Sequence, residues 1–377
     1  MAIPRMVRNR APCLPTTSRF ASGRPTAALV RYWSSMPLPP RGCCSAIRPT
    51  ENGSGVRLNR ISRIDAAVVG GGRWAGEHAL TLLDVLPAEA KLHVCSSSNP
   101  EAWDEFAQRL GCEDRSRLVA CNTIDDIGHT SSVGMVVVAR RARDHAETAI
   151  RLLQAGKCVL IEKPFALTLA DSQRIAASAS PNRCAVSLPL LHATYMQQFL
   201  AASGRIGRRR RVNIIWSDAM GEVRRGRVKR HDPSVSVILD VFPHIWSIIA
   251  QAGLGGALDL NQVFVGNAGA DIEMQFLANG VVTEARMTRN GSTRMRILSI
   301  QGEDGEACID FSEEPGHATV AGMPICVSAG FSSPLRRMLR FAYRSFLNNE
   351  PLGLHDVRLA HRVLEFALEA EKEAVER

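Results

Sequence analysis

Lysine is scarce in this sequence: only five of the 46 basic residues are lysines. Aromatic residues make up 5% of the chain, and no apolar run approaches the roughly 18 residues of a membrane-spanning helix. The ten cysteines include no CxxC pair and no spacing typical of metal ligands. These absences argue against a membrane protein, a metal site and a disulfide framework. They favour a reducing compartment, and we expect a cytoplasmic protein.

Acidic residues are absent from the first 50 positions, which hold eight arginines. This segment supplies most of the net charge of +9, so the rest of the chain is nearly neutral. The basic composition is therefore no argument for a nucleic-acid partner. Residues 1–60 are too rich in arginine, serine and proline to bury a core. We expect a disordered or non-native extension there, for example from a start codon assigned too early, and an organelle-targeting peptide is the alternative.

A dinucleotide fingerprint follows the first apolar strand, which we predict at 64–69. The sequence G-G-G-R-W-A at 70–75 comes next, before a helical pattern of alanines and leucines. Gly70 permits a tight turn, Gly72 lets the backbone approach a pyrophosphate, and Ala75 allows the helix to pack closely on the strand. The residues of this loop that we expect to bind the dinucleotide are Gly70, Gly72, Arg73, Trp74 and Ala75.

Serines follow the second predicted strand at 91–95, where an NAD site usually has an acidic residue for the ribose. No carboxylate in this stretch would repel a 2′-phosphate, and hydroxyl groups can donate hydrogen bonds to one. We therefore predict that Ser96, Ser97 and Ser98 bind the cofactor and that the cofactor is NADP. NAD remains possible if an acidic residue from elsewhere binds the ribose.

The stretch V-L-I-E-K-P-F at 159–165 combines a predicted buried strand with an abrupt end. Lys163 then lies at the carboxyl end of a strand, where open α/β sheets form their binding crevices. Because arginine is the usual cation in this chain, a lysine here suggests that a compact ammonium group is required. An ordinary strand end with a solvated lysine is the alternative.

Two domains follow from the order of the predicted elements. Strands alternate with helices up to residue 165, which predicts an α/β Rossmann domain with a doubly wound parallel sheet at 61–165. Later strand-like runs are separated by turn signals such as Asn279-Gly280 and Asp304-Gly305. They predict an α+β domain at 166–377, with a mostly antiparallel sheet and flanking helices. The C-terminal helix is a candidate to pack back on the Rossmann domain.

Asp240 and His244 lie in a segment, 234–252, whose apolar residues recur at helical spacing. Positions i and i+4 project from the same face of a helix, although Pro243 adjoins the histidine. An ion pair on a core helix is the simpler interpretation of this pair alone. The Lys163 strand end in the same chain makes a functional interpretation the better one.

Three segments together resemble the Gfo/Idh/MocA family of oxidoreductases, which includes glucose–fructose oxidoreductase and inositol dehydrogenase. They are the fingerprint extended to His78, the segment 136–164 with its E-K-P ending, and the D-x-x-x-H at 240–244. The similarity covers about 64–375. It implies that the second domain binds the substrate and forms a homodimer or homotetramer through a sheet that is open on one face.

The resemblance also implies roles for single residues. It makes Lys163, Asp240 and His244 catalytic, with Lys163 and His244 sharing the proton transfer. It adds to the cofactor-binding residues a second set, which consists of Arg140, His145, Glu162, Lys163 and Pro164. The chain departs from the family on the expected substrate side, at Arg140-Arg141, 188–192, Ser236-Val237 and Ser247. These departures leave the substrate open.

The predicted chemistry is the oxidation of an alcohol, or the reverse reduction of a carbonyl group. A group that titrates near neutrality should accept the hydroxyl proton, and His244 is the natural candidate. Asp240 would orient the imidazole and favour its charged form. Lys163 would donate to the substrate oxygen and stabilise the negative charge that develops there.

We therefore predict an NADP-dependent oxidoreductase that acts on a sugar, a cyclitol or a related small molecule. The alternative is a cofactor-binding regulator or scaffold on the same fold. Residues 205–230 hold ten basic and two acidic residues. As a hypothesis, the loop at 217–233 borders the substrate mouth and favours an anionic substrate; a solvated arginine-rich edge is the alternative. No aromatic residues interleave the basic run, so we expect no nucleic-acid partner, and we expect no membrane partner.

Overall fold

The computed structural model describes residues 64–96, 99, 101–224, 227–228 and 231–376. All of them lie in the part of the chain that begins at Gly55. The extension expected at 1–60, together with Ser97 and Ser98, lies outside the described residues. No helix within the described ranges is long and apolar enough to cross a membrane.

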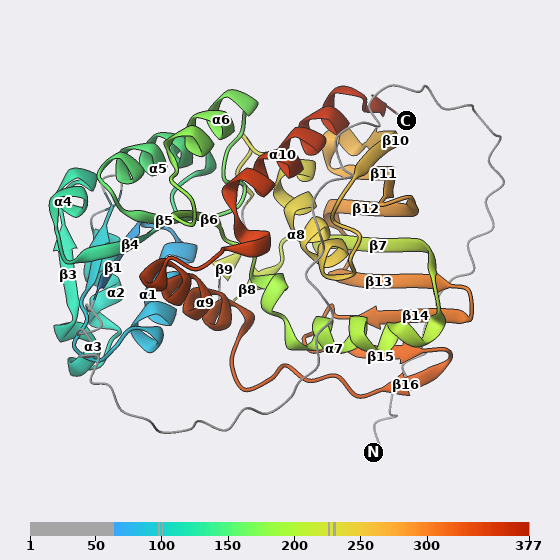
Figure 1. Ribbon diagram of the computed structural model, residues 1–377, viewed down its shortest axis with the longest axis horizontal. Coiled ribbons are helices and arrows are strands. Elements are labelled where there is room, and N and C mark those ends of the chain that lie inside the picture. Colours follow the sequence, from blue (N-terminus) through green and yellow to red (C-terminus); the bar gives the residue numbers. More distant parts are fainter. Residues whose placement is uncertain (1–63, 97–98, 100, 225–226, 229–230, 377) are drawn as a thin grey trace, which may run out of the picture. The chain divides into compact units, whose positions relative to one another are not determined.

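Within the described residues, six parallel strands form the first sheet in the order β3-β2-β1-β4-β5-β6 (Figure 1). The strands are β1 (Asp65–Val69), β2 (Leu92–Cys95), β3 (Leu118–Cys121), β4 (Val133–Val138), β5 (Cys158–Ile161) and β6 (Cys184–Val186). This order confirms the predicted doubly wound sheet, whose switch point lies between β1 and β4. The sheet continues past residue 165, since β6, which we expected in the second domain, pairs with β5.

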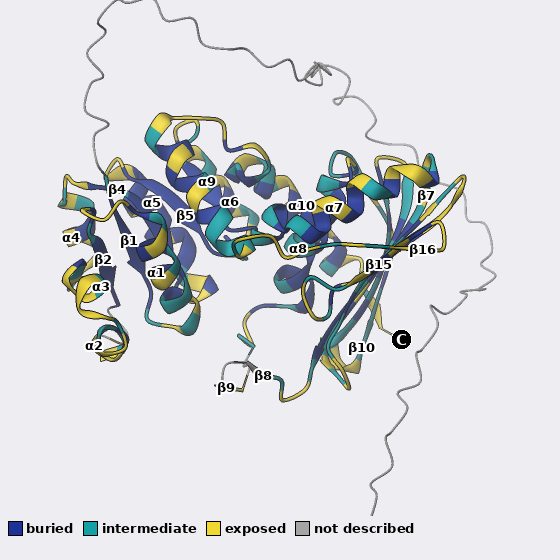
Figure 2. Cartoon of the chain, turned by 90° about the horizontal axis from the view of Figure 1, so that it is seen from below, coloured by how far each residue is buried: buried dark blue, intermediate teal, exposed yellow. Residues whose placement is uncertain are grey.

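Different helices cover the two faces of this sheet. Ala66 and Val68 of β1 face α1 (Arg73–Val85) and α9 (Pro334–Asn348), which comes from the end of the chain. The alternate residues of β1 face α5 (His145–Gln154) and α6 (Leu169–Ser178). Figure 2 shows β1, β4 and β5 as largely buried, whereas the edge strand β3 is half-buried. Shorter helices flank its edge: α2 (Glu101–Gln108), α3 (Cys112–Ser116) and α4 (Ile124–His129).

The second sheet has the order β16-β15-β14-β13-β7-β12-β11-β10-β17 among the described residues. Its strands are β7 (Arg209–Ala219), β10 (Leu258–Gly266), β11 (Asp271–Ala278), β12 (Val281–Gly291), β13 (Met295–Gly302), β14 (Gly305–Asp310), β15 (His317–Val320), β16 (Met323–Ile325) and β17 (Val375–Glu376). Most neighbours are antiparallel, as predicted. The exceptions are β7 with β12 and β10 with β17, which pair in parallel. A short hairpin, β8 (Val223–Arg224) and β9 (Arg227–Val228), follows β7.

Helix α8 (Val237–Gln251) links the second sheet to the candidate site. The hydroxyl of Ser236 accepts a hydrogen bond of 3.0 Å from the Leu239 N–H, so the helix begins after this cap. Phe242 packs edge-on against Phe276 of β11 and holds the helix on the sheet. Asp240 therefore lies in the first turn and His244 one turn later. The remaining helices are α7 (Thr194–Ala202) and α10 (Val357–Lys372).

Candidate active site

The turn between β1 and α1 is shaped for a phosphate group. Gly70 has φ +147°, and a Cβ there would lie 2.2 Å from the Ala139 carbonyl oxygen. A Cβ on Gly72 would meet no atom within 4 Å, so the space in front of this residue is open. Helix α1 has no side-chain cap and no acidic residue in its first turn. Its N–H groups are therefore available to an anion, and the residues fit a dinucleotide pyrophosphate.

A pocket beside this turn is lined by both signs of charge. Arg73 and Arg109 line it together with Glu77 and Glu105. Trp74 is 46% exposed, and the Arg73 guanidinium lies 5.6 Å from the centre of its ring. The charges of the pocket therefore do not distinguish a phosphorylated from an unphosphorylated ribose.

Ser96 is the one described residue of the three predicted serines. It is buried, and its hydroxyl oxygen accepts a hydrogen bond of 3.1 Å from the Asn99 N–H. It also packs against the glycine turn, since a Cβ on Gly71 would lie 2.4 Å from the Ser96 Oγ. Ser96 therefore shapes the turn, while Ser97 and Ser98 lie outside the described residues.

Glu162 is buried at the end of β5 and bonds to protein groups. Its Oε1 accepts hydrogen bonds from His78 Nε2 at 2.6 Å and from Ser187 Oγ at 2.5 Å, and its Oε2 accepts from the Lys163 N–H at 3.2 Å. Burial alone would raise the pKa of Glu162, but these hydrogen bonds outweigh it and lower the pKa to about 2. The carboxylate thus fixes the backbone that carries Lys163.

His145 ties two loops of the predicted cofactor site together. Its ring is buried, with Nδ1 2.8 Å from the Pro164 carbonyl oxygen and Nε2 3.1 Å from the Arg140 carbonyl oxygen. Burial lowers its pKa. The Arg140 guanidinium donates to Thr148 Oγ1 at 2.9 Å and lies 3.9 Å from Asp144. The rings and side chains that we expected at the cofactor thus bond within the protein, as Glu162 does.

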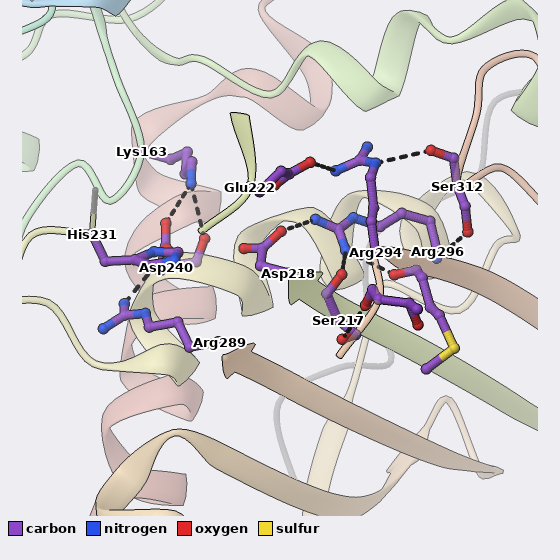
Figure 3. A network of polar contacts seen from close by, with 12 residues as sticks. Lys163, Ser217, Asp218, Glu222, His231, Asp240, Arg289, Arg294, Arg296 and Ser312 are labelled. Atoms are coloured by element: carbon purple, nitrogen blue, oxygen red, sulfur yellow. Dashed lines mark hydrogen bonds and ion pairs between the residues drawn. The ribbon is translucent and has the colours of Figure 1, made fainter. Parts of the chain in front are cut away.

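Asp240 holds Lys163 and is surrounded by cations. The Lys163 Nζ donates to Asp240 Oδ1 at 2.6 Å and to the Asp240 carbonyl oxygen at 3.1 Å (Figure 3). The other carboxylate oxygen lies 3.5 Å from Arg289 and 3.7 Å from His231 Nδ1. Burial would raise the pKa of Asp240, but the charge of Lys163 and these neighbours keep it well below its usual value. The predicted Lys163 and Asp240 are therefore in direct contact.

His244 lies nearby but does not bond to Asp240. The structure gives no hydrogen bond between the two side chains in the described part, because Asp240 is directed to Lys163. The imidazole instead stacks on Trp216, with ring centres 5.0 Å apart and planes 8° apart. Burial, and then the charge of Lys163, lower the pKa of His244 to about 3. The predicted orientation by Asp240 and the predicted titration near neutrality are both wrong for this structure.

A second set of charges lies beside the stacked rings. Arg296 of β13 and Asp218 of β7 form an ion pair whose side chains are each 3% exposed. Arg294 donates to the Ser312 carbonyl oxygen at 2.8 Å and lies 3.6 Å from Glu222. Figure 3 shows this set beside the Lys163–Asp240 contact. The acidic residues thus compensate the described arginines next to the site.

The basic residues at 205–230 lie in two groups, at the beginning of β7 and after its end. Arg209, Arg210 and Arg211 begin the strand, where Arg210 lies 3.4 Å from Glu303 and Arg211 lies 2.5 Å from Glu284. Trp216 lies five to seven residues further along the strand, which is about 17 to 23 Å at roughly 3.3 Å per residue. These arginines therefore do not border the Lys163 site. Four positions of the rest of the run, 225–226 and 229–230, lie outside the described residues.

No individual role was predicted for several residues that complete this arrangement, although Asp218 and His231 fall in the loop 217–233 that we expected at the substrate mouth. The whole set consists of Trp216, Asp218, His231, Arg289, Arg294 and Arg296, together with Ser187 on the first sheet. One signal was available: Arg296, Leu298 and Ile300 occupy every second position of a strand and therefore share its buried face. An arginine at such a position requires a buried partner.

Comparison with known proteins matches the first domain of the chain to a family. Residues 64–189 match the family model GFO_IDH_MocA, an oxidoreductase family with an NAD-binding Rossmann fold. An uncharacterised oxidoreductase of Escherichia coli, YhhX, is 37% identical over 97 residues, which are 24% of this chain and 28% of that protein. Inositol 2-dehydrogenase 1 of Saccharopolyspora erythraea is 32% identical over 136 residues, 36% of this chain and 38% of that protein. The matches thus span well under half of these relatives.

Solved structures share the fold over nearly their whole length. UDP-N-acetylglucosamine 3-dehydrogenase GnnA from Acidithiobacillus ferrooxidans aligns with a TM-score of 0.66 and 21% identity, over 82% of this chain and 97% of that one. KijD10, a 3-ketoreductase from Actinomadura kijaniata in complex with NADP, aligns with a TM-score of 0.66 and 18% identity, over 83% and 98%. The first domain thus matches the Gfo/Idh/MocA oxidoreductase family model at 64–189, and the two-sheet fold is shared with these solved structures.

Proposed function

We propose that this protein is an NADP-dependent oxidoreductase that acts on a hydroxyl or carbonyl carbon of a sugar, a cyclitol or a related small molecule. The observation that carries the proposal is the 2.6 Å contact between Lys163 and Asp240. It joins the carboxyl end of β5 in the first sheet to α8 of the second domain, beside His244. Crevices at the carboxyl ends of parallel strands are where such folds bind their ligands.

The fit of the cofactor rests on the turn before α1. The open space at Gly72 and the uncapped helix would hold the pyrophosphate, with Arg73, Trp74 and Ala75 in the first turn. When bound, the dinucleotide supplies hydride transfer to or from the substrate carbon. The 3-ketoreductase KijD10 was solved with NADP, and GenD2 from gentamicin A biosynthesis was solved with NAD. We favour NADP because of the serines at 96–98.

The proton chemistry falls to Lys163 and His244. Lys163 is positioned by Asp240 and by the buried Glu162 before it, and it would donate to the substrate oxygen. A pKa of about 3 keeps the His244 imidazole neutral at physiological pH, and the neutral form is the one that accepts a proton. We propose that Glu162 and His145 position these groups and do not react.

Two features of the proposal concern the partner molecules. The relatives include an inositol dehydrogenase and the structural neighbours a nucleotide-sugar dehydrogenase, which supports a polyol-like substrate. Asp218, Glu222 and Asp240 each pair with one of the described arginines at the site, so these arginines leave no net positive charge that would favour an anionic substrate. The hypothesis of an anionic substrate therefore rests on the basic residues at 224–230. We also propose a homodimer or homotetramer, with the second sheet at the interface.

The test begins with the purified protein and no added cofactor. Any retained dinucleotide is identified by mass spectrometry, and polyols, cyclitols and nucleotide sugars are then screened for NADPH and NADH formation. We expect NADP to be retained or to bind more tightly than NAD, and at least one polyol to be oxidised. A protein that binds the dinucleotide but oxidises none of these compounds, and reduces none of their ketones, would support the regulator or scaffold instead.

A further inference from the structure

The imidazole of His244 is held by a flat aromatic contact. Its ring lies nearly parallel to the indole of Trp216, with centres 5.0 Å apart, and Trp216 is only 8% exposed. The Nδ1 atom is buried and has no hydrogen-bond partner in the described part of the chain. Because no hydrogen bond sets the plane of the ring, the contact with Trp216 is what sets it.

The indole of Trp216 is itself held in place by an arginine and by the sheet. The Arg296 guanidinium lies 3.9 Å from the centre of the Trp216 ring and is paired with the buried Asp218. Arg296 and Trp216 are direct neighbours across β13 and β7, so both are placed by the sheet. Phe311 meets the same indole edge-on, with ring centres 6.5 Å apart. The stack of imidazole, indole and guanidinium is therefore part of the rigid core.

The charges that face His244 come from several elements. Lys163 after β5 and Arg296 of β13 disfavour a proton on the imidazole, whereas Asp240 of α8 and Glu162 after β5 favour one. Each of these four groups already has a charged or hydrogen-bonding partner of opposite kind. No carboxylate contacts the ring itself in the described part of the structure. The nearest group able to stabilise a positive imidazole by direct contact is thus the face of Trp216.

We propose that Trp216 is a positioning residue for His244, which it holds in plane and stabilises by a cation–π contact when the ring takes up a proton. The inference rests on the proposed function. In alcohol oxidation the substrate O–H bond breaks and its proton goes to His244 Nε2, since Nδ1 is buried. The C–H electron pair leaves as hydride to the oxidised nicotinamide, and the carbonyl product remains. Positive charge then appears on the imidazole that stacks on the indole, and tryptophan is the best aromatic partner for a cation.

The first test uses fluorinated tryptophans placed site-specifically at position 216. Fluorine withdraws π-electron density and changes the shape of the ring little. In the free protein, the His244 Cε1–H resonance, assigned with His244→Ala, should be shifted upfield by the indole. The protein is acidified from pH 6 to pH 4, and the pH at which this resonance begins to shift is recorded for each tryptophan. That pH should be about half a unit lower for each added step of fluorination. A resonance without the upfield shift, or titrations that coincide, would overturn the proposal.

The second test separates the aromatic contact from the volume of the side chain. Trp216→Phe keeps an aromatic face and Trp216→Leu does not, although both leave a cavity. We expect kcat to be about tenfold lower in the leucine variant than in the phenylalanine variant, with KM changed less than twofold. The same fluorinated residues at Trp246, a buried tryptophan of α8, the helix that carries His244, should leave kcat unchanged. Equal kcat in the two variants would contradict the proposal. If the protein oxidises no substrate, the resonance titration still decides it, so the two failures are distinguishable.

Discussion

At the scale of single residues, two glycines of the turn before α1 have different tasks. Gly70 is needed by the protein itself, because its φ of +147° and the Ala139 carbonyl oxygen leave no room for a side chain. Gly72 has φ −88° and open space in front of it, so the protein alone does not require glycine there. The requirement at Gly72 comes from the ligand.

This difference gives a prediction with a built-in control. Gly70→Val should destabilise the protein by several kcal/mol, since it combines a clash with a strained backbone. Gly72→Val should change the free energy of unfolding by less than about 1 kcal/mol but weaken dinucleotide binding at least about tenfold. Urea unfolding and isothermal titration measure the two effects. If Gly72→Val binds the dinucleotide like the wild type, the pyrophosphate does not lie at this turn.

Two substitutions test the proposed proton chemistry at the same scale. Lys163→Met and His244→Ala should each lower turnover at least about a hundredfold, the usual size of an acid–base contribution. Asp240 keeps Arg289 as a neighbour when Lys163 is removed, so the fold should survive. Lys91→Met, at an exposed hydrogen bond to the Ser116 carbonyl oxygen, is the control and should be fully active. Near-normal turnover in both site variants would refute their roles.

The site residues that could be predicted are those that belong to short motifs. Lys163 lies at a strand end, and Asp240 and His244 are four apart on a helix, so local spacing is enough to find them. Trp216 and Arg289 lie on separate strands of the second sheet, and their relation to the site depends on which strands pair. For the same reason the partner of His244 was mistaken: Asp240 is close in sequence, but Lys163 competes for it in space.

At the scale of elements, the buried pair Asp218–Arg296 joins β7 to β13 under the site. Removal of one partner leaves a buried charge without compensation, which typically costs 3–5 kcal/mol, so we expect about that loss for Asp218→Asn and for Arg296→Met. The half-exposed pair Arg211–Glu284, which starts from the same strand, should contribute less than about 1 kcal/mol to the free energy of unfolding. Urea unfolding of Arg296→Met and Arg211→Met compares the two pairs. Equal losses would mean that burial does not set the contribution.

The elements themselves were predicted better than their pairing. Hydrophobic periodicity and turn signals placed the strands of the first sheet and the helix with Asp240. The strand at Cys184–Val186 was assigned to the wrong domain, because three buried residues carry no information about their neighbour. The parallel pairing of β7 with β12 also has no local signal, since the strands are more than 60 residues apart in the chain.

At the scale of the whole molecule, four histidines of the described part, the buried His145 and His355 and the half-buried His192 and His244, make stability depend on pH. Burial lowers the pKa of His145, His192, His244 and His355, to about 4 for His192. In the unfolded chain a histidine titrates near 6.5. Their contribution to the free energy of unfolding is therefore fully present above pH 6.5. It is lost as the pH falls toward the lower pKa values of the folded protein, because the unfolded state binds protons first.

The expected slope is at most about 1.4 kcal/mol per pH unit for each histidine between these limits. His192→Gln should reduce the slope between pH 6.5 and pH 4.5, because one of the groups that protonates on unfolding is gone. The glutamine can still donate to His355 Nε2, which lies 2.9 Å from the His192 ring. Urea unfolding at several pH values measures the slope. An unchanged slope would show that His192 takes up its proton equally in both states.

Helix α9 determines when the first sheet becomes fully covered during synthesis of the chain. Met338, Leu339 and Phe346 pack into the same apolar cluster as Ala66 and Val68 of β1, and the Tyr343 hydroxyl donates to the Ile64 carbonyl oxygen. During synthesis, the dinucleotide half emerges first, but the part of one sheet face that α1 does not cover stays exposed until α9 is made. A chain cut short before α9 would therefore present that face to chaperones, even though every dinucleotide-binding residue named above has been synthesised.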